Sequence, residues 1–593
     1  MSSNFTIFSS AISALNVNSL GLSIAGQNIA NVNTPGYSRQ RINIAPAEAQ
    51  TSGTLEVGRG ALVKDVQRIY DNFAEARLAD ASSENGQADA RAEQLNQVQE
   101  LFNEIGQDGI SKFMSDFFNS FNGVAADPTA TAPRLDALSK AGTLVQRLHS
   151  LSQALKDNRT SIDTAISSRI DKINSIAAEI TDINDKINLS GGETLVLRDQ
   201  RALKVRELSE MMDVKSVETS NGEFQVYFGN GLQLLSGVSR ATLSTEANTN
   251  DLGHFKVMLT VGSGSAVDVS DRVTGGSLKG YLTARDTDIP AYEAKLNEVA
   301  YELATQVNLL HTSGYDLGGV TARKFFATLT SVAASTDLAT NLRTSTGTKL
   351  QIASGDVITI GGNLGGAFST TLTVSATTTL ADIATAVQTA LRAAAGASGT
   401  ETAAVQGDGT IRVTSGATAI TGLTLSIPSK TTFNTAFTFT TPITAGGGTG
   451  SSAALGVAGS DSAGLIAISS DVDGLPQQIA AASSAATLPA GNSIALQLVA
   501  IKDSSINFST GSTTIGTFYS NLLSRVGTDA GQAARDQSFS SSVLSQSEQQ
   551  RERISGVSIE EEQLDLARFQ AAFQAASKLV AVAAEILKLL VEL

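Results

Sequence analysis

Apolar side chains near the start of the chain recur at alternating steps of three and four residues, the spacing of one face of a helix. No charged side chain occurs before Arg39, and the other positions are mostly Ser, Asn and Gln. Gly21 and Gly26 weaken such a helix but leave room for another helix to approach closely. Pro35 and Gly36 then end it, because Pro disfavours helix in the residue before it and Gly accepts a positive φ. The predicted N-terminal seam consists of Phe5, Phe8, Ile12, Leu15, Leu22 and Ile29.

The end of the chain repeats this pattern more strongly. The predicted C-terminal seam consists of Leu566, Phe569, Phe573, Ala576, Val580, Ala583, Leu587 and Leu590. Leu579, Ile586 and Leu593 form a second apolar stripe at seven-residue intervals. Chain ends usually fray unless something holds them, and so apolar a helix gains its stability mainly from packing. Two ordinary core helices would explain both seams, but their positions favour termini that pair with each other, with neighbouring subunits, or with both.

Helical patterns also fill most of the first third of the chain. After a partly strand-like linker over 41–66, a polar helix is predicted from Ile69 to Phe102. A phenylalanine-rich helix follows at 113–121, which we interpret as core rather than a partner site. Pro133 opens a long helix whose apolar seam continues to Ile187. A seam of this length predicts a rod-like helical bundle.

Composition then shifts toward strands. Phe224–Phe228 and Phe255–Val261 predict a small β domain, and 326–509 is rich in Thr, Ala, Gly and Ser with four predicted strands and one helix. The predicted fold class is therefore an α+β multidomain protein, with terminal coiled-coil-like helices, a long helical bundle domain and inserted β-rich outer domains. The predicted units are a terminal helix and turn (1–45), a helical domain (46–215, completed by 275–325 and 515–555), a small β domain (216–274), a variable outer domain (326–510) and a C-terminal amphipathic helix (556–593).

Charge and composition exclude several classes of protein. The net charge of −15 and a pI near 4.8 argue against a nucleic-acid-binding surface. The chain has no cysteine, which excludes disulfides, Cys-ligated zinc and a thiol nucleophile. The N-terminus lacks the features of a cleaved signal peptide, and no stretch approaches the ~18 apolar residues of a membrane span.

The sequence offers no candidate catalytic, cofactor-binding or metal-binding site. His149, His254 and His311 are isolated from one another, and no HExxH, Walker A or GxSxG motif occurs. Glu560, Glu561 and Glu562 are adjacent carboxylates, but at the start of a helix they are better explained by capping and by the helix dipole. We therefore predict that the protein is not an enzyme.

Both termini resemble known signatures. The segment 28–39, with Asn31, Asn33, Thr34, Pro35, Gly36 and Tyr37 at its turn, resembles the N-terminal signature of the bacterial flagellar axial proteins, the rod, hook and hook-associated families. Residues 556–562 with 569–576 are similar to their C-terminal signature. Leu197–Val214 and 275–282 further resemble the hook-associated members that join hook to filament. The resemblance covers roughly the first 325 and the last 80 residues.

This resemblance implies a structural subunit at the hook–filament junction that allows filament assembly. It implies export in unfolded form by the flagellar type III apparatus, a chaperone for the C-terminal seam, and an extracellular location. The implied partners are other copies in a ring, with the hook protein on one side and a second junction protein on the other. The terminal helices would form an inner tube. Alternatives are another axial protein (hook, distal rod or second junction protein) or a secreted surface adhesin.

Overall fold

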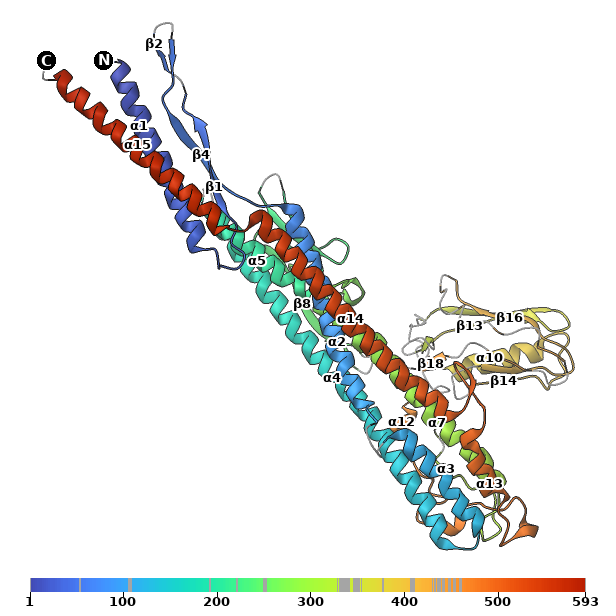
Figure 1. Ribbon diagram of the computed structural model, residues 1–593. Coiled ribbons are helices and arrows are strands. Elements are labelled where there is room, and N and C mark those ends of the chain that lie inside the picture. The colour runs from blue at the N-terminus through green and yellow to red at the C-terminus, as the bar shows by residue number, and fades with distance from the viewer. Residues whose placement is uncertain are drawn as a thin grey trace.

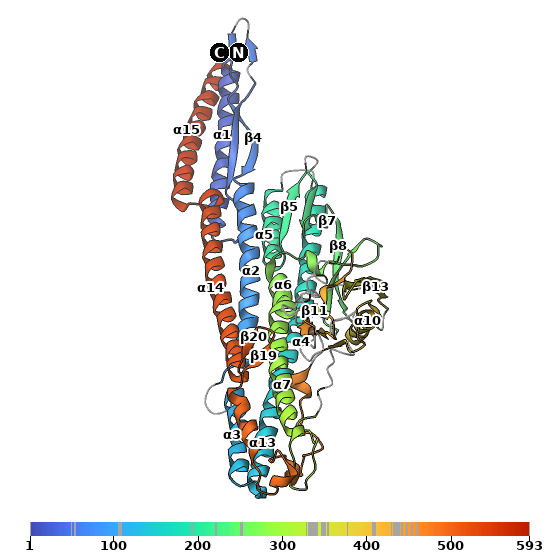
Figure 2. The ribbon, with the colours of Figure 1, turned by 90° about the vertical axis from the view of Figure 1, so that its right-hand side faces the viewer.

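The computed structural model forms a long rod of helices that carries two β-rich parts along one side (Figures 1 and 2). The N- and C-terminal helices lie together at one end of the rod (Figure 1). The fold is an α+β combination, as predicted. The structure describes residues 2–591 except 49, 53–54, 105–108, 191–193, 220–221, 249–252, 328, 330–341, 345–351, 353–354, 376–377, 406–410, 429, 431–433, 435–438, 440–442, 446–448, 452–454 and 458–460.

Long helices run along the rod, and their bounds follow the predicted apolar seams closely. They are α2 (Asn72–Leu101), α3 (Ile110–Ala126), α4 (Thr131–Leu189), α5 (Leu195–Met211), α6 (Gly276–Thr283), α7 (Ile289–Ser313) and α14 (Ile515–Ser555). A π-helical turn, Ala284–Asp288, joins α6 to α7. Helix α4 has 59 residues, and its buried stripe includes Leu138 and Ile180. The predicted rod-like bundle is confirmed.

The phenylalanines of α3 form the core of the far half of the rod. Phe117, Phe118 and Phe121 are fully buried together with Phe325 and Phe326. The centroid of the Phe117 ring lies 5.2–5.7 Å from the centroids of the other four rings. Such aromatic packing supplies much of the apolar burial here, so the prediction that this cluster is core is confirmed.

A six-stranded antiparallel sheet lies against α4. Its order is β10-β9-β8-β7-β6-β5, with β5 (Val214–Glu218), β6 (Phe224–Phe228), β7 (Leu232–Ser236), β8 (Ser239–Ala247), β9 (Phe255–Val261) and β10 (Val267–Asp268). A buried cluster holds it there: His254 Nδ1 lies 2.6 Å from Asp163 Oδ2 on α4, and Arg285 of the π turn pairs with Asp163 Oδ1 at 2.5 Å. The sheet shares one apolar core with the helices.

A second β-rich part, the outer module, has an apolar core of its own. It contains the sheets β13-β12-β16 and β14-β15-β17 and the helix α10. Its elements are β12 (Val357–Asn363), β13 (Ala367–Thr373), α10 (Leu380–Ala393), β14 (Thr402–Val405), β15 (Ile411–Thr414), β16 (Thr421–Ser426) and β17 (Thr449–Ser451). The predicted strands and helix of this region are present. A short pair, β11 (Leu342–Thr344) with β18 (Leu455–Val457), joins the segments on either side of the module.

The predicted end of the outer domain at residue 510 lies too far along the chain. From residue 462 the chain packs back into the rod, where Ile479, Leu498 and Phe508 belong to its core. This segment has the Ala- and Ser-rich composition of the module, so composition could not mark the boundary. Its elements are α12 (Ser462–Leu465), η3 (Pro476–Gln478), η4 (Ala485–Thr487), α13 (Ser493–Ala500), η5 (Ile501–Asp503), β19 (Ile506–Phe508) and β20 (Gly511–Thr513). The other domain limits stay predictions.

The terminal part of the rod combines two helices with a long β hairpin. Helices α1 (Ser2–Ala30) and α15 (Ile559–Val591) lie side by side. Strands β1 (Gln40–Pro46) and β4 (Ala61–Arg68) form an antiparallel ladder beside α1, extended by the short pair β2 (Gln50–Ser52) and β3 (Leu55–Val57). The sequence predicts a linker with some strand over 41–66, and the ladder is more regular than this prediction.

His311 on α7 is a buried neutral side chain that should make the rod sensitive to acid. Its Nδ1–H donates to Arg323 O (2.7 Å), and its Nε2 accepts from Ala480 N (2.9 Å). Burial, with the nearby Arg134 charge, lowers its pKa to about 4. The unfolded chain binds a proton near pH 6.5, whereas the folded chain stays neutral until about pH 4. This group should therefore remove about 3 kcal/mol of stability as the pH falls across that window.

Urea unfolding at pH 7 and pH 4.5 measures this effect. We expect His311→Gln to be less stable than the parent at pH 7 but to lose less stability on acidification. An equal pH-dependent loss in both proteins would contradict the prediction.

Candidate functional site

Within the chain, α1 packs on α15 through a face of mostly small residues. Gly21 is buried against Phe569 of α15, whereas Val17 and Ile24 are buried in a cluster with Ile42 of β1, and Phe569 packs against that cluster. Ala11 and Ala25 are also buried. The Phe569 ring covers Gly21, and a Cβ atom at residue 21 would lie 2.7 Å from it. Because no real Cβ packs that closely, this helix contact depends on glycine.

The predicted N-terminal seam lies beside this face. Phe8, Leu15, Leu22 and Ile29 are half-buried, Ile12 is 39% exposed, and the side chain of Phe5 lies outside the described residues. The physical reason is that the helices approach through their smallest residues, which leaves the larger side chains at the edge of the contact. On α15, Ala576 and Ala583 are buried, Leu566, Phe569, Phe573 and Val580 are half-buried, and the side chains of Leu587 and Leu590 lie outside the described residues. The packing role of both seams stays a prediction.

The signature turn joins this helix pair to the rod, and a buried asparagine lies at its centre. Asn28 is 1% exposed and uses both ends of its amide. Its Nδ2 donates to Gln40 O (2.9 Å) and Glu562 Oε2 (3.0 Å), while its Oδ1 accepts from Tyr37 OH (2.8 Å) and Gln40 N (3.0 Å). A half-satisfied buried amide would be costly, so Asn28 fixes the relative positions of α1, β1 and α15. We did not predict this role, although Asn28 continues the buried spacing of Val17, Gly21 and Ile24.

The turn itself is tight. Thr34 N donates to Asn31 O (2.9 Å), Tyr37 N donates to Thr34 O (3.2 Å), and Gly36 has φ +79°. Leu203 of α5 lies against Gly36, where a Cβ would be 3.2 Å from its side chain. Asn33, Thr34 and Pro35 are exposed. The glycine is therefore needed for its conformation and for its approach to the rod.

Arg39 pairs with the acidic start of α15. Its Nε lies 2.5 Å from Glu562 Oε1 and its Nη2 lies 3.4 Å from Asp565, and it also pairs with Glu561. Ser558 Oγ accepts from Glu561 N (3.4 Å), as expected of a helix cap. These carboxylates thus hold Arg39 and begin a helix, which agrees with the non-catalytic interpretation.

Arg551, near the end of α14, clamps the turn from the other side. Its side chain is 3% exposed, and its Nη2 donates to Gly36 O (3.0 Å) and Tyr37 O (3.1 Å). Its Nε pairs with Glu75 Oε1 at 3.1 Å and its Nη1 with Glu552 at 2.7 Å. We call this set of contacts around Asn28, Arg39 and Arg551 the joint.

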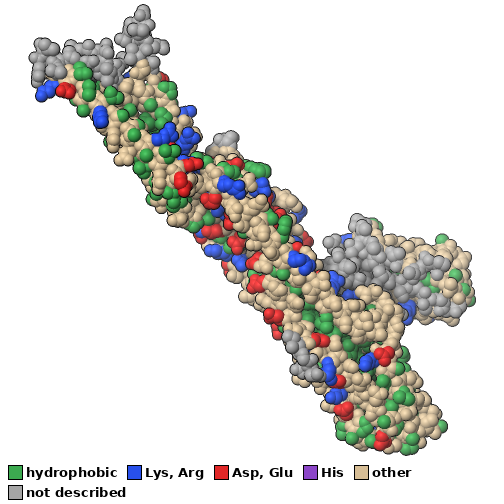
Figure 3. Space-filling model, viewed as in Figure 1, with side chains coloured by type: hydrophobic (Ala, Val, Ile, Leu, Met, Phe, Trp, Pro, Cys, Tyr) green, Lys and Arg blue, Asp and Glu red, His purple; other side chains and the backbone are tan. Residues whose placement is uncertain are grey.

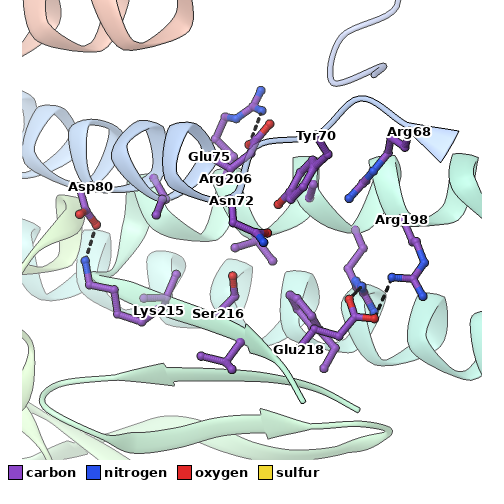
Figure 4. Close-up of a pocket in the computed structure, with 18 residues that line it drawn as sticks. Arg68, Tyr70, Asn72, Glu75, Asp80, Arg198, Arg206, Lys215, Ser216 and Glu218 are labelled. Atoms are coloured by element: carbon purple, nitrogen blue, oxygen red, sulfur yellow. Dashed lines mark hydrogen bonds and ion pairs between the residues drawn. The ribbon is translucent and has the colours of Figure 1, made fainter. Parts of the chain in front are cut away.

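A cleft of about 340 Å³ lies beside the joint, between α2, α5 and β5 (Figure 4). Charged side chains line it, and they pair with one another: Arg206 with Glu75, Arg198 and Arg201 with Glu218, and Lys215 with Asp80. Glu75 also binds Arg551, so the network runs from the cleft to the turn. We interpret the cleft as support for the joint, because its cations already have protein carboxylates as partners.

The ionisable groups of the joint keep their hydrogen-bonding roles and hold the turn in place. Burial, together with the charges of Asp199 and Glu562, raises the pKa of Tyr37 to about 12, so its hydroxyl stays a donor. Burial alone would lower the pKa of Arg551, but its bonds to Glu75 and Glu552 outweigh this and raise it. No group of His, Asp or Glu among the described residues is arranged to hold a metal ion. None of the described helices is both long and apolar enough to cross a membrane.

Comparisons with known proteins match the N-terminal segment and much of the helical rod. The family model described as flagellar hook-associated protein FlgK helical domain matches residues 95–326, and that of the flagella basal body rod protein matches residues 8–37. The flagellar hook-associated protein 1 of Escherichia coli (strain K12) is 28% identical over 328 residues, which is 54% of this chain and 60% of that protein. Its counterpart in Bacillus subtilis (strain 168) is 24% identical over 361 residues, 55% of this chain and 71% of that protein.

The fold is also similar to a solved structure. The flagellar hook junction protein FlgK from Burkholderia pseudomallei superposes with a TM-score of 0.52 at 19% identity, covering 81% of this chain and all of that one. This likeness concerns the fold alone. The match spans only about 60% of the length of the Escherichia coli and Salmonella relatives. Taken together, the helical-domain model, the rod-protein model at the N-terminus and the curated relatives show that this chain is similar to flagellar hook-associated protein 1 over slightly more than half of its length.

Proposed function

We propose that the protein is a structural subunit of the bacterial flagellum at the junction between hook and filament. Its terminal helices would pack with those of other copies in a ring, between the hook protein and a second junction protein. Subunits would leave the cell unfolded through the flagellar type III apparatus, after a chaperone has shielded the C-terminal seam. The location would be extracellular, and the role would be structural rather than catalytic.

The observation that carries this proposal is that α15 has more apolar side chains than its contact with α1 buries. One side of the helix packs on α1, whereas the flank next to that side leaves Leu579 54%, Val582 54% and Ile586 39% exposed. Apolar side chains are visible along the terminal helices in the space-filling view, whereas the middle of the rod carries mixed charges (Figure 3). Exposed apolar stripes of this kind mark interaction surfaces. Neighbouring terminal helices would cover this stripe.

Deletion of the gene tests the proposal directly. We expect cells with bare hooks, seen by electron microscopy, and flagellin released into the medium, because filament subunits would be exported without a junction on which to assemble. Complementation with the full gene should restore filaments. Cells without hooks would assign the protein to the rod or hook instead. Normal filaments would contradict a flagellar junction role and favour the surface adhesin.

A further inference from the structure

Strand β13 of the outer module forms an edge of its sheet among the residues that the structure describes. In the sheet β13-β12-β16, β13 pairs with β12 on one side and has no partner strand on the other among the described residues. The β12–β13 ladder runs without irregularity through seven residue pairs, from Ala367 to Thr373. Alternate residues of β13 therefore direct their N–H and C=O groups away from β12. These groups form a row that another extended strand could pair with.

This edge lacks the features that usually prevent pairing. Proteins protect exposed edges with charged residues, proline, bulges or very short strands. Residues 367–373, Ala-Phe-Ser-Thr-Thr-Leu-Thr, contain no charge and no proline, and their ladder has no bulge. Ser369, Thr370 and Thr371 are exposed. The edge is therefore suited to pairing rather than protected from it.

A groove beside β13 leaves room for an incoming strand. It has a volume of about 860 Å³ and lies between β13 and the helix α10. The α10 side chains that line it are mostly small and uncharged, Thr385, Ala386, Thr389, Ala390 and Ala393. Its only lining charge, Asp382, accepts from the backbone N–H and the hydroxyl of Thr379 at 2.8 Å, as a helix cap. The groove therefore favours an uncharged extended strand.

We propose that the partner of this edge is the same strand of a second copy of the chain. An antiparallel pair centred on Thr370 would place Thr370 opposite Thr370 of the second copy. Ser369 would then face Thr371, and Phe368 would face Leu372. Polar residues thus face polar ones and large apolar residues face each other, which are the stabilising cross-strand combinations. The contact is self-complementary, as a two-fold interface requires. It is separate from the packing of the terminal helices.

Because the chain has no cysteine, any disulfide in a single-cysteine variant must form at the introduced residue. In the proposed register the Cβ atoms of the two Thr370 residues would be about 4.5–5.5 Å apart, near enough for a disulfide after small adjustment. We expect full-length Thr370→Cys to form a disulfide-linked dimer under mild oxidation at micromolar concentration. Thr373→Cys is the matched control on the same strand, because two copies of residue 373 would lie about 20 Å apart. It should cross-link at least tenfold less.

A second variant separates strand pairing from chance collision. Adding Thr371→Lys to Thr370→Cys should lower cross-linking at least tenfold, because a lysine on the edge opposes pairing. Circular dichroism should show that all variants keep the parental helix content. A monomeric Thr370→Cys protein, or equal cross-linking at residues 370 and 373, would overturn the proposal. These outcomes do not depend on whether the protein forms the flagellar junction.

Discussion

Replacing Arg551 by Met is expected to release the signature turn from the rod while the rod itself stays folded. The substitution keeps much of the side-chain volume but removes the cation. The carbonyls of Gly36 and Tyr37 lose their shared donor. Among the described residues, the half-buried Glu75 then keeps only Arg206 as an ion-pair partner. Removing one partner of a buried ion pair typically costs about 3–5 kcal/mol. The loss should be local, because the bonds of the Arg551 guanidinium go to the turn, to Glu75 and to Glu552.

Amide hydrogen exchange reports this loss at defined positions. Ser38 N donates to Asp199 Oδ2 (3.1 Å) and Arg39 N donates to Ser555 O (2.8 Å), both within the joint. Their exchange should become roughly a hundred- to several thousandfold faster. Exchange at Ala480 N, which donates to His311 Nε2 on α7 and has no contact with the joint, should not change.

Arg553→Met is the matched control for this prediction. Arg553 lies two residues further along α14, is exposed and has no ion pair among the described residues. Its replacement should leave the exchange of Ser38 and Arg39 at the parental rate. Arg551→Lys should be intermediate, because a single ammonium group cannot match the planar guanidinium at several acceptors. Unchanged protection in Arg551→Met would show that the turn is held by other contacts.

Much of this architecture could be predicted from apolar periodicity. The seam from Leu138 to Ile187 became α4, and the alternation at Phe224–Phe228 became β6, because long regular patterns permit few other arrangements. The predicted end of the outer domain at residue 510 was wrong because the segment before it has no long regular pattern. Residues 462–508 have only short elements, and their burial depends on surfaces supplied by α3, α4 and α7.

The joint shows a different limit of sequence reasoning. The turn at Pro35 and Gly36 could be recognised, but its partners Asn28, Arg551 and Glu562 could not be assigned from spacing. Each interacts with residues up to several hundred positions away, and a buried polar contact leaves no periodic signal. Seam residues were chosen by size, whereas the structure brings α1 and α15 together through glycine and alanine.

The packing of α1 on α15 makes Gly21→Leu the other substitution with a large expected effect. The leucine would occupy the space of the Phe569 ring, so the helices must separate or Phe569 must leave its place. Overpacking of this kind typically costs about 1–3 kcal/mol, and loss of the ring contact adds to it. We expect amide exchange along α1 to become at least tenfold faster, and the variant to restore motility poorly in the deletion strain.

Gly26→Leu provides the matched control, because a Cβ at residue 26 has no atom within 4 Å. Both substitutions gain the same helix propensity, roughly 1 kcal/mol relative to glycine. Gly26→Leu should therefore leave α1 as well protected as in the parent, or better. If Gly21→Leu behaved in the same way, the contact between Gly21 and Phe569 could not be what pairs the two helices.

A compensating substitution then separates a clash from a general weakening of α1. Phe569→Ala alone should loosen the pair by removing the ring from Gly21. In combination with Gly21→Leu, it removes the ring that the leucine would strike. The double variant should therefore lose less amide protection along α1 than the two single variants lose in sum. Simple additivity would mean that the two residues act independently. Recovery would establish that α15 is positioned on α1 by a large side chain fitting onto a glycine.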